Sequence, residues 1–199
     1  MDAPARATSS NATRAATTVR DFVGVYENVV PADVCKGIVA FYDKNAPWKP
    51  STYSGYEGVV NTPERVAMVE HWIQPDQPYF KDLVAGLNGG LERYAKDHPD
   101  FFVAKSNGFR INRYGPGGYM GRHVDNIHRS HGQKEGFPLA SCSIILNENF
   151  AGGEFVFFGD YVVPAREGQA IIFPSNFLFP HEVKPITKGV RYSIVTWML

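Results

Sequence analysis

The C-terminal half of the chain carries the pattern that most restricts its fold. After Phe101, short apolar runs follow one another and are separated by clusters of Gly, Pro and Asn. These runs cover residues 108–114, 141–146, 153–158, 169–173 and 191–198. Several short apolar runs bounded by turn-forming residues are typical of antiparallel strands. We therefore expect the C-terminal half to be an antiparallel β sandwich or barrel.

The N-terminal half has a helical period instead. Apolar residues recur at helical spacing from Pro31 to Tyr42 and again after Pro78, which predicts one helix in each place. Glycines weaken the second helix, at Gly86, Gly89 and Gly90. Residues 48–63 are dense in Pro, Gly, Ser, Tyr and Asn, and are predicted to form a long irregular loop. We expect the helices to pack against the outside of the β structure.

The length and composition of the chain fit a single folded domain. A chain of 199 residues, 44% of them hydrophobic, can build one core, and no internal repeat or composition break divides it. We therefore expect one domain over residues 21–199. Residues 1–20 are mostly Ala, Thr, Ser and Arg without apolar periodicity, which predicts a flexible tail. This Arg-rich, acid-poor composition also fits an organelle transit peptide, although its amphipathic face is weak.

The charge and cysteine content disfavour several classes of partner. The 20 Lys and Arg residues balance 20 Asp and Glu residues, so nothing attracts the chain generally to extended nucleic acid or to an anionic membrane. The chain has no apolar run long enough to span a membrane and no secretory signal, so we expect a soluble, cytoplasmic protein. Cys35 and Cys142 lie far apart and predict neither a disulfide framework nor a zinc site. The sequence leaves the oligomeric state open.

Three residues could bind a metal ion together. His123 and Asp125 are two positions apart, and residues at that spacing in a strand point to the same face. His181 follows the predicted strand 169–173 after a short turn flanked by Pro, where a β barrel can return a side chain to the same interior. Two imidazoles and one carboxylate on one face of a metal are used by non-haem Fe(II) oxygenases. A surface His beside a surface Asp is the alternative interpretation.

A second candidate site begins at Arg191. Arg191 and Ser193 share one face of the predicted strand 191–198, and Val195 and Trp197 continue that face. Burying a guanidinium on an apolar strand is costly unless an anion meets it. The pattern therefore suggests a fork that receives a carboxylate through two hydrogen bonds, assisted by the serine hydroxyl. An internal salt bridge or an exposed strand edge is the alternative.

Seven short segments between residues 107 and 199 carry a resemblance to a known family. They are, in chain order, Ile111-Asn112-Arg113-Tyr114, Arg122-His123-Val124-Asp125, Ile144-Ile145-Leu146-Asn147, Gly152-Gly153-Glu154-Phe155, Glu167-Gly168-Gln169-Ala170-Ile171-Ile172-Phe173-Pro174, Phe179-Pro180-His181-Glu182-Val183 and Gly189-Val190-Arg191-Tyr192-Ser193. With these segments in this order, the chain resembles the Fe(II)/2-oxoglutarate-dependent dioxygenases, and among them most closely the prolyl 4-hydroxylase-like branch. The helical N-terminal half is similar only weakly.

The resemblance implies a fold and a metal site. The fold would be α+β and mainly β, a double-stranded β-helix (jelly roll) with N-terminal helices packed on its outside. His123, Asp125 and His181 would be the catalytic residues that bind Fe(II). Halogenating relatives carry a small residue in place of this carboxylate, so Asp125 favours hydroxylation.

The resemblance also implies 2-oxoglutarate as the co-substrate. Arg191 would pair with its distal carboxylate, helped by Ser193 and by the hydroxyl of Tyr114. Prolyl hydroxylases of the animal-collagen type use lysine at this position, so Arg191 argues against adopting a collagen substrate. Such enzymes couple the oxidative decarboxylation of 2-oxoglutarate to the hydroxylation of an unactivated C–H bond. Whether L-ascorbate is also needed is left open by the sequence.

These features support one leading function and two alternatives. We expect a hydroxylase acting on prolyl residues in a peptide or protein, or on a related small amino-acid substrate. One alternative is an oxygenase of the same type acting on another small molecule or a nucleobase. The other is a catalytically inactive, cupin-like binding module. Positive charges between Arg110 and Lys134 belong to a solvated loop or attract an anionic ligand. Substrate choice depends on loops 48–63 and 126–137, which the sequence pattern does not describe.

Overall fold

Strands from both halves of the chain build a large antiparallel sheet, the major sheet. The computed structural model describes residues 18–55, 58–60, 64–125 and 137–199. The seven strands of the major sheet are, in spatial order, β1 (Gly24–Tyr26), β13 (Ala170–Pro174), β9 (Ala140–Ile145), β16 (Arg191–Met198), β7 (Phe109–Tyr114), β6 (Val69–Ile73) and β2 (Lys49–Pro50). All five strands predicted from the apolar runs are present in the structure, four of them in this sheet.

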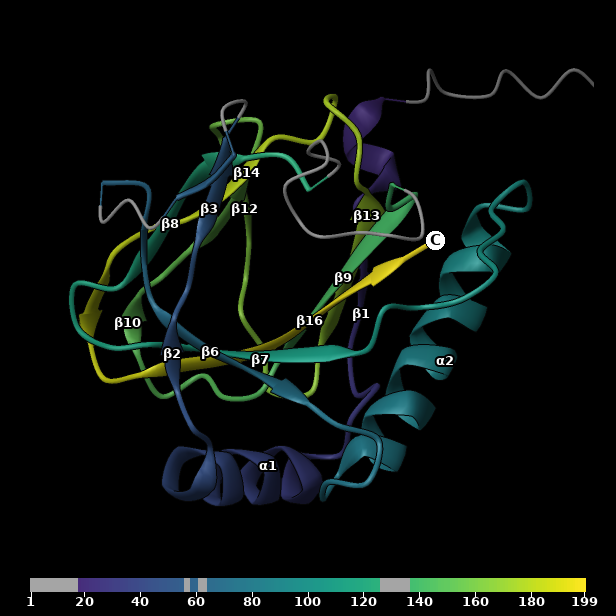
Figure 1. Cartoon of the computed structure of the whole chain (residues 1–199). Coiled ribbons are helices and arrows are strands. Elements are labelled where there is room, and N and C mark those ends of the chain that lie inside the picture. Colours follow the sequence, from purple (N-terminus) through teal and green to yellow (C-terminus); the bar gives the residue numbers. More distant parts are fainter. Residues whose placement is uncertain (1–17, 56–57, 61–63, 126–136) are drawn as a thin grey trace, which may run out of the picture.

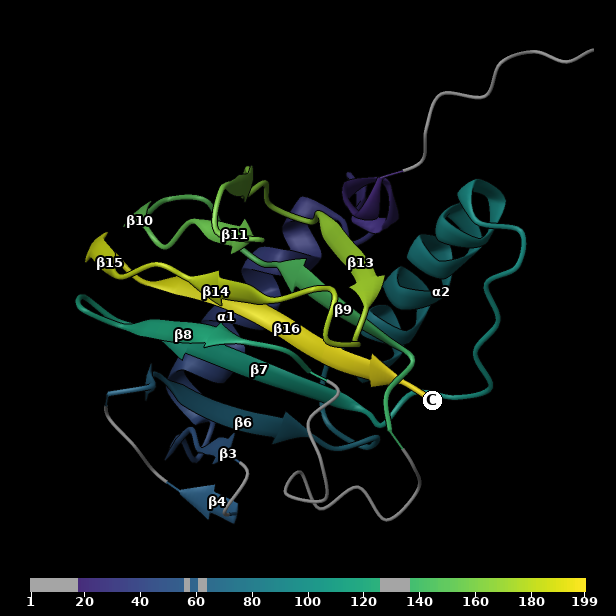
Figure 2. The same cartoon turned by 90° about the horizontal axis from the view of Figure 1, so that it is seen from above.

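A smaller sheet, the minor sheet, faces one side of the major sheet. Its strands are, in spatial order, β12 (Tyr161–Val163), β11 (Phe155–Phe157), β14 (His181–Val183), β8 (Tyr119–His123) and β5 (Val66–Ala67). Two short pairs complete the β structure, β10 (Ala151–Gly152) with β15 (Ile186–Lys188), and β3 (Tyr53–Gly55) with β4 (Gly58–Val60). The two facing sheets (Figures 1 and 2) form the expected jelly roll.

Two helices cover the other side of the major sheet (Figure 1), as predicted. They are α1 (Ala32–Asn45) and α2 (Phe80–Asp97), preceded by a single 3-10 turn, η1 (Val19–Phe22). The strands of the major sheet therefore have two buried faces. On β13, for example, Ile172 packs with the helices whereas Ile171 packs between the sheets. Burial on both faces explains why these strands read as nearly continuous apolar runs.

Two glycines of α2, Gly86 and Gly89, differ in the space around them. A Cβ atom at Gly86 would lie 2.6 Å from Cγ2 of Val30 and 3.0 Å from the carbonyl oxygen of Val29. A Cβ atom at Gly89 would meet no other atom within 4 Å. Gly86 therefore permits close contact between the helix and the segment before α1.

Replacing these two glycines should have opposite effects on stability. Gly86→Ala should lower the free energy of unfolding by about 1–3 kcal/mol, because the new methyl group overpacks a tight contact. Gly89→Ala should raise it by about 0.5–1 kcal/mol, because alanine has the higher helical propensity and the space is open. Urea denaturation measures both values. Equal effects of the two substitutions would contradict this packing.

The segment before α2 differs from its prediction. The expected irregular loop over residues 48–63 contains β2, β3 and β4, and the following β5 and β6 were not predicted. These strands are short and take their register from distant partners, such as β7 for β6, which local composition does not reveal. Residues 1–17 of the predicted tail and residues 126–136 of the second loop lie outside the described residues. Within the described ranges, no helix has the length and apolar character needed to cross a membrane.

Candidate functional site

His123 and His181 lie opposite each other on neighbouring strands of the minor sheet. His123 is the last residue of β8 and His181 the first of β14, and the two are direct partners in the antiparallel register. Their ring centroids are 4.3 Å apart. Asp125 follows after β8 has ended, and its Oδ1 lies 3.4 Å from Nε2 of His123 and 3.7 Å from Nε2 of His181. The expectation that one strand carries both His123 and Asp125 is therefore wrong, because the chain leaves the strand between them.

Backbone carbonyl groups orient both imidazoles. Nδ1 of His123 lies 2.9 Å from the carbonyl oxygen of Gly121, and Nδ1 of His181 lies 3.0 Å from that of Phe179. Each Nδ1–H can therefore donate to a carbonyl two residues earlier, which leaves the Nε2 lone pair facing Asp125. An outer hydrogen bond of this kind is what fixes the tautomer of a metal-binding histidine.

Burial sets the charge of this cluster. Desolvation, together with the nearby His123, lowers the pKa of His181 to about 4, so this imidazole is neutral at physiological pH. Burial opposes ionisation of Asp125, but His181, His123 and a hydrogen bond from Ser141 hold the pKa of its carboxyl group well below the usual range. The attraction from His181 is lost once this imidazole is neutral, so the buried carboxylate then lacks that compensating charge, and burying an uncompensated charge is costly. The cluster therefore suits a cation.

The three side chains also meet the requirement of a metal site for converging donors. One nitrogen from each histidine and one oxygen of Asp125 lie within 4.8 Å of one another. Within the described part of the chain, no other group of three His, Cys, Asp or Glu side chains converges in this way. Two nitrogen donors and one carboxylate oxygen match the donor set that suits non-haem Fe(II). The residues present fit such an ion.

Arg191 is a buried cation and the second part of the candidate site. It is the first residue of β16, is 1% exposed, and lies opposite Tyr114 of β7. Its Nη1 donates to Oγ of Ser193 at 2.9 Å, and its guanidinium carbon lies 5.3 Å from the Tyr114 ring centroid. Burial lowers the pKa of Arg191. Its Nε has no hydrogen-bond partner, and no carboxylate lies within ion-pair distance, among the described residues.

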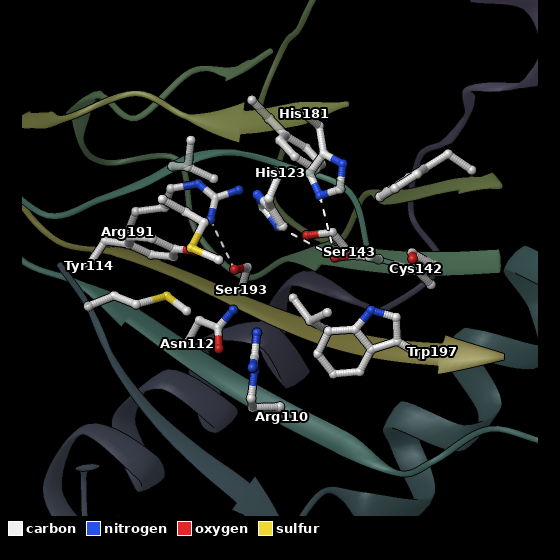
Figure 3. A pocket seen from close by; sticks show the side chains of 18 residues that line it. Arg110, Asn112, Tyr114, His123, Cys142, Ser143, His181, Arg191, Ser193 and Trp197 are labelled. Carbon is white, nitrogen blue, oxygen red and sulfur yellow. Dashed lines mark hydrogen bonds and ion pairs between the residues drawn. The ribbon is translucent and has the colours of Figure 1, made fainter. Parts of the chain in front are cut away.

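A single cavity between the sheets joins Arg191 to the histidine cluster. Figure 3 shows His123 and His181 on one side of the cavity, with Arg110 and Asn112 across from them. The structure thus brings together all six residues selected from the sequence, which are Tyr114, His123, Asp125, His181, Arg191 and Ser193. Trp197, which continues the face of Arg191, also lines the cavity.

Sequence reasoning missed several cavity residues: Met68, Asn112, Ser141 and Ser143. Asn112 could have been found from the alternation on β7, because it shares a face with Tyr114. Ser141 carries no such signal. Its hydroxyl hydrogen-bonds to Asp125 and lies 2.7 Å from that of Ser175, contacts that only the folded structure creates.

The positive charges noted on β7 are divided between its two faces. Arg110 faces the cavity, where its Nη1 lies 3.1 Å from Oε2 of Glu70. Arg113 faces α1, where its Nε lies 2.9 Å from Oδ1 of Asp43. Tyr192 donates to the same oxygen of Asp43. Arg129 and Lys134 lie outside the described residues.

The contacts of Asp43 predict a small, pH-dependent contribution to stability. Hydrogen bonds from Tyr192 and Arg113 lower the pKa of Asp43 in the folded state. The stabilisation is therefore complete above the ordinary Asp pKa of about 4 and is lost as the pH falls through the lowered value. Asp43→Asn should reduce the free energy of unfolding by less than about 1 kcal/mol at pH 7, because solvent screens this half-exposed pair. Unfolding titrations should show the difference shrinking below pH 4, and a constant difference would contradict the assignment.

The segment that builds the cavity matches a known family. The model of the 2OG-Fe(II) oxygenase superfamily matches residues 109–199, which include all six selected residues. Over residues 109–199, the chain is therefore similar to the 2OG-Fe(II) oxygenase superfamily. The expected family resemblance is confirmed for this part of the chain.

Curated proteins similar to this chain are PKHD-type hydroxylases. The chain is 32% identical to one from Klebsiella pneumoniae over 127 residues, which are 58% of this chain and 55% of that protein. It is 39% identical to one from Caulobacter vibrioides over 96 residues, which are 44% of this chain and 41% of that protein. The chain thus spans about half the length of the curated relatives it matches.

Solved structures share the fold of this protein over most of the chain. A Pseudomonas putida prolyl-4-hydroxylase superposes with a TM-score of 0.68 at 20% identity, covering 89% of this chain and 91% of that one. A Trichoplax adhaerens prolyl hydroxylase, solved with a peptide fragment of hypoxia inducible factor, gives 0.70 at 19% identity, covering 90% of this chain and 84% of that one. At these identities the likeness shows the fold, and the N-terminal helices are part of it.

Proposed function

We propose that this protein is an Fe(II)- and 2-oxoglutarate-dependent hydroxylase that acts on prolyl residues in a peptide or protein. The observation that carries the proposal is the buried Arg191, a cation without an acidic partner in the described structure, in the same cavity as the His123, Asp125 and His181 cluster. A dicarboxylate that reaches both a metal ion and Arg191 would satisfy both ends of this cavity.

Each selected residue then has a role. The two imidazoles and the carboxylate would hold Fe(II), and Arg191, Ser193 and the hydroxyl of Tyr114 would hold the distal carboxylate of 2-oxoglutarate. When bound, Fe(II) and 2-oxoglutarate supply the chemistry that activates dioxygen, forms succinate and carbon dioxide, and hydroxylates a C–H bond. The carboxylate of Asp125 would balance part of the charge of the metal ion. Phenylalanine rings pack around His181 and exclude water from its side of the cavity, at Phe155, Phe157 and Phe173.

The prolyl substrate is supported by the relatives. Curated relatives are PKHD-type hydroxylases, and two similar structures are prolyl hydroxylases, one of them solved with a peptide. Arg191 in place of lysine does not change the co-substrate, because either cation can meet a carboxylate.

The test supplies the full chain with Fe(II), 2-oxoglutarate labelled at C1 and a library of proline-containing peptides. We expect labelled carbon dioxide, unlabelled succinate and a peptide whose mass increases by one oxygen at proline. Succinate formed without oxygen on any prolyl residue would refute the prolyl substrate and keep the co-substrate. If neither succinate nor an oxidised peptide forms, the proposed function is refuted.

A further inference from the structure

Two polar side chains on β7 line one end of the cavity. Arg110 and Asn112 are two positions apart, face the same side of the strand and line the cavity with Trp197 (Figure 3). The side chain of Arg110 is 12% exposed, whereas Arg191 is 1% exposed. The end of the cavity at Arg110 is therefore the more accessible end, where a substrate can meet the protein.

Neighbouring side chains hold Arg110 in place and neutralise it. Its Nη1 pairs with Oε2 of Glu70 on β6, and the same oxygen accepts a hydrogen bond from Oγ of Ser51 at 2.6 Å. The guanidinium carbon of Arg110 lies 4.8 Å from the ring centroid of Trp197. The carboxylate and the ring orient the arginine before any ligand arrives, which lowers the entropy cost of binding.

Each of the two side chains still has an unused buried atom. Nε of Arg110, a donor, and Oδ1 of Asn112, an acceptor, are buried and have no hydrogen-bond partner among the described residues. The amide of Asn112 hydrogen-bonds to Tyr114, which leaves its oxygen available. Leaving a buried polar group unsatisfied is costly, so an unused donor and an unused acceptor in the same cavity indicate a missing ligand.

The charge balance selects the chemistry of that ligand. A carboxylate suits this end of the cavity poorly, because Glu70 already neutralises Arg110 and the Asn112 oxygen would repel an anion. A neutral group that offers both an acceptor and a donor suits it well. A main-chain amide is such a group, since its carbonyl can accept from Arg110 and an N–H can donate to Asn112.

We propose that Arg110 and Asn112 bind the main-chain amide groups of a peptide next to the residue that is hydroxylated, so that the site selects residues within peptides over free amino acids. Glu70 and Ser51 are positioning residues for Arg110, and Trp197 forms the flat wall beside the bound chain. This inference rests on the proposed function, because it assumes that 2-oxoglutarate occupies the Arg191 end.

The test measures binding rather than turnover. The full chain is loaded with Mn²⁺ and 2-oxoglutarate without oxygen and titrated with a pool of tripeptides that have a central proline and are acetylated and amidated. Free L-proline is the comparison. We expect the blocked tripeptides to bind at least ten-fold more tightly than free proline. Arg110→Met and Asn112→Leu should each weaken peptide binding at least ten-fold, while Arg110→Met changes 2-oxoglutarate affinity less than two-fold.

Two further variants separate recognition from folding. Arg110→Met combined with Glu70→Gln avoids leaving a buried carboxylate unpaired and should lose peptide affinity to the same extent. Arg113→Met removes an arginine from the opposite face of β7 and should leave peptide affinity unchanged.

Three results would overturn the inference alone, provided that 2-oxoglutarate binds the wild-type chain. The first is that the blocked tripeptides do not bind. The second is that free proline and the blocked tripeptides bind equally tightly. The third is that the Arg110→Met variants keep the peptide affinity of the wild type. Failure of the wild-type chain to bind 2-oxoglutarate in the presence of Mn²⁺ would overturn the proposed function, and the inference with it.

Discussion

His123→Ala and His181→Ala should each lower the rate of succinate formation from 2-oxoglutarate at least about 100-fold, since loss of an outer hydrogen bond to a metal ligand alone costs 10–100-fold. Each substitution removes one of the three donor atoms that lie within 4.8 Å of one another. Mn²⁺ affinity should fall in parallel, and a chelator should abolish the wild-type activity until Fe(II) is restored.

A matched control comes from a histidine outside the cavity. His98 follows α2 and stacks on the ring of Phe22. His98→Ala should therefore keep both Mn²⁺ affinity and succinate formation, while circular dichroism verifies that all three variants are folded. Wild-type activity in His123→Ala or His181→Ala would show that these imidazoles do not hold the metal.

Arg191→Met should weaken 2-oxoglutarate binding on the order of 100-fold, in the range found when a buried charge pair loses one partner. Mn²⁺ affinity should change little, because Arg191 is not among the donor atoms of the cluster. The ligand-free variant should be more stable than the wild type by about 1–3 kcal/mol, since the substitution removes a buried guanidinium whose Nε is unsatisfied among the described residues. Opposite changes in affinity and stability are expected of a residue that is kept for binding.

Calorimetric titration with 2-oxoglutarate and urea denaturation measure these two quantities. Arg191→Lys is the conservative comparison. It keeps the charge but loses the fork that pairs with a carboxylate through two bonds, so its affinity should fall between those of the other two proteins. Unchanged 2-oxoglutarate affinity in Arg191→Met would assign the co-substrate to a different part of the cavity.

Local patterns were sufficient to predict much of this fold. Five strands and both helices follow from such patterns, because the strands are apolar runs bounded by turn-forming residues and the helices show helical spacing. The five strands are β7, β9, β11, β13 and β16. Strands β5 and β6 were missed, and their register depends on pairing with the distant strands β8 and β7. The close contact at Gly86 was equally hidden, because a glycine reads as a weak helix former until its neighbour is known.

The site, too, was predictable from the sequence only in part. His123, Asp125 and Arg191 were visible because a histidine two residues from an aspartate, and an arginine on an apolar strand, are chemically conspicuous. The bend that brings Asp125 to both imidazoles was not visible, since it occurs after β8 ends. The role we propose for Arg110 depends on Glu70, which comes from a strand that was not predicted.

The central claim is that the histidine cluster and Arg191 hold opposite ends of one ligand, and thermodynamic coupling tests it most directly. The measurement is the affinity for 2-oxoglutarate, without oxygen, in the presence and absence of Mn²⁺. We predict that Mn²⁺ raises this affinity at least about ten-fold, that 2-oxoglutarate raises Mn²⁺ affinity by the same factor, and that the coupling disappears in His123→Ala. An affinity for 2-oxoglutarate that does not depend on Mn²⁺ would contradict the account.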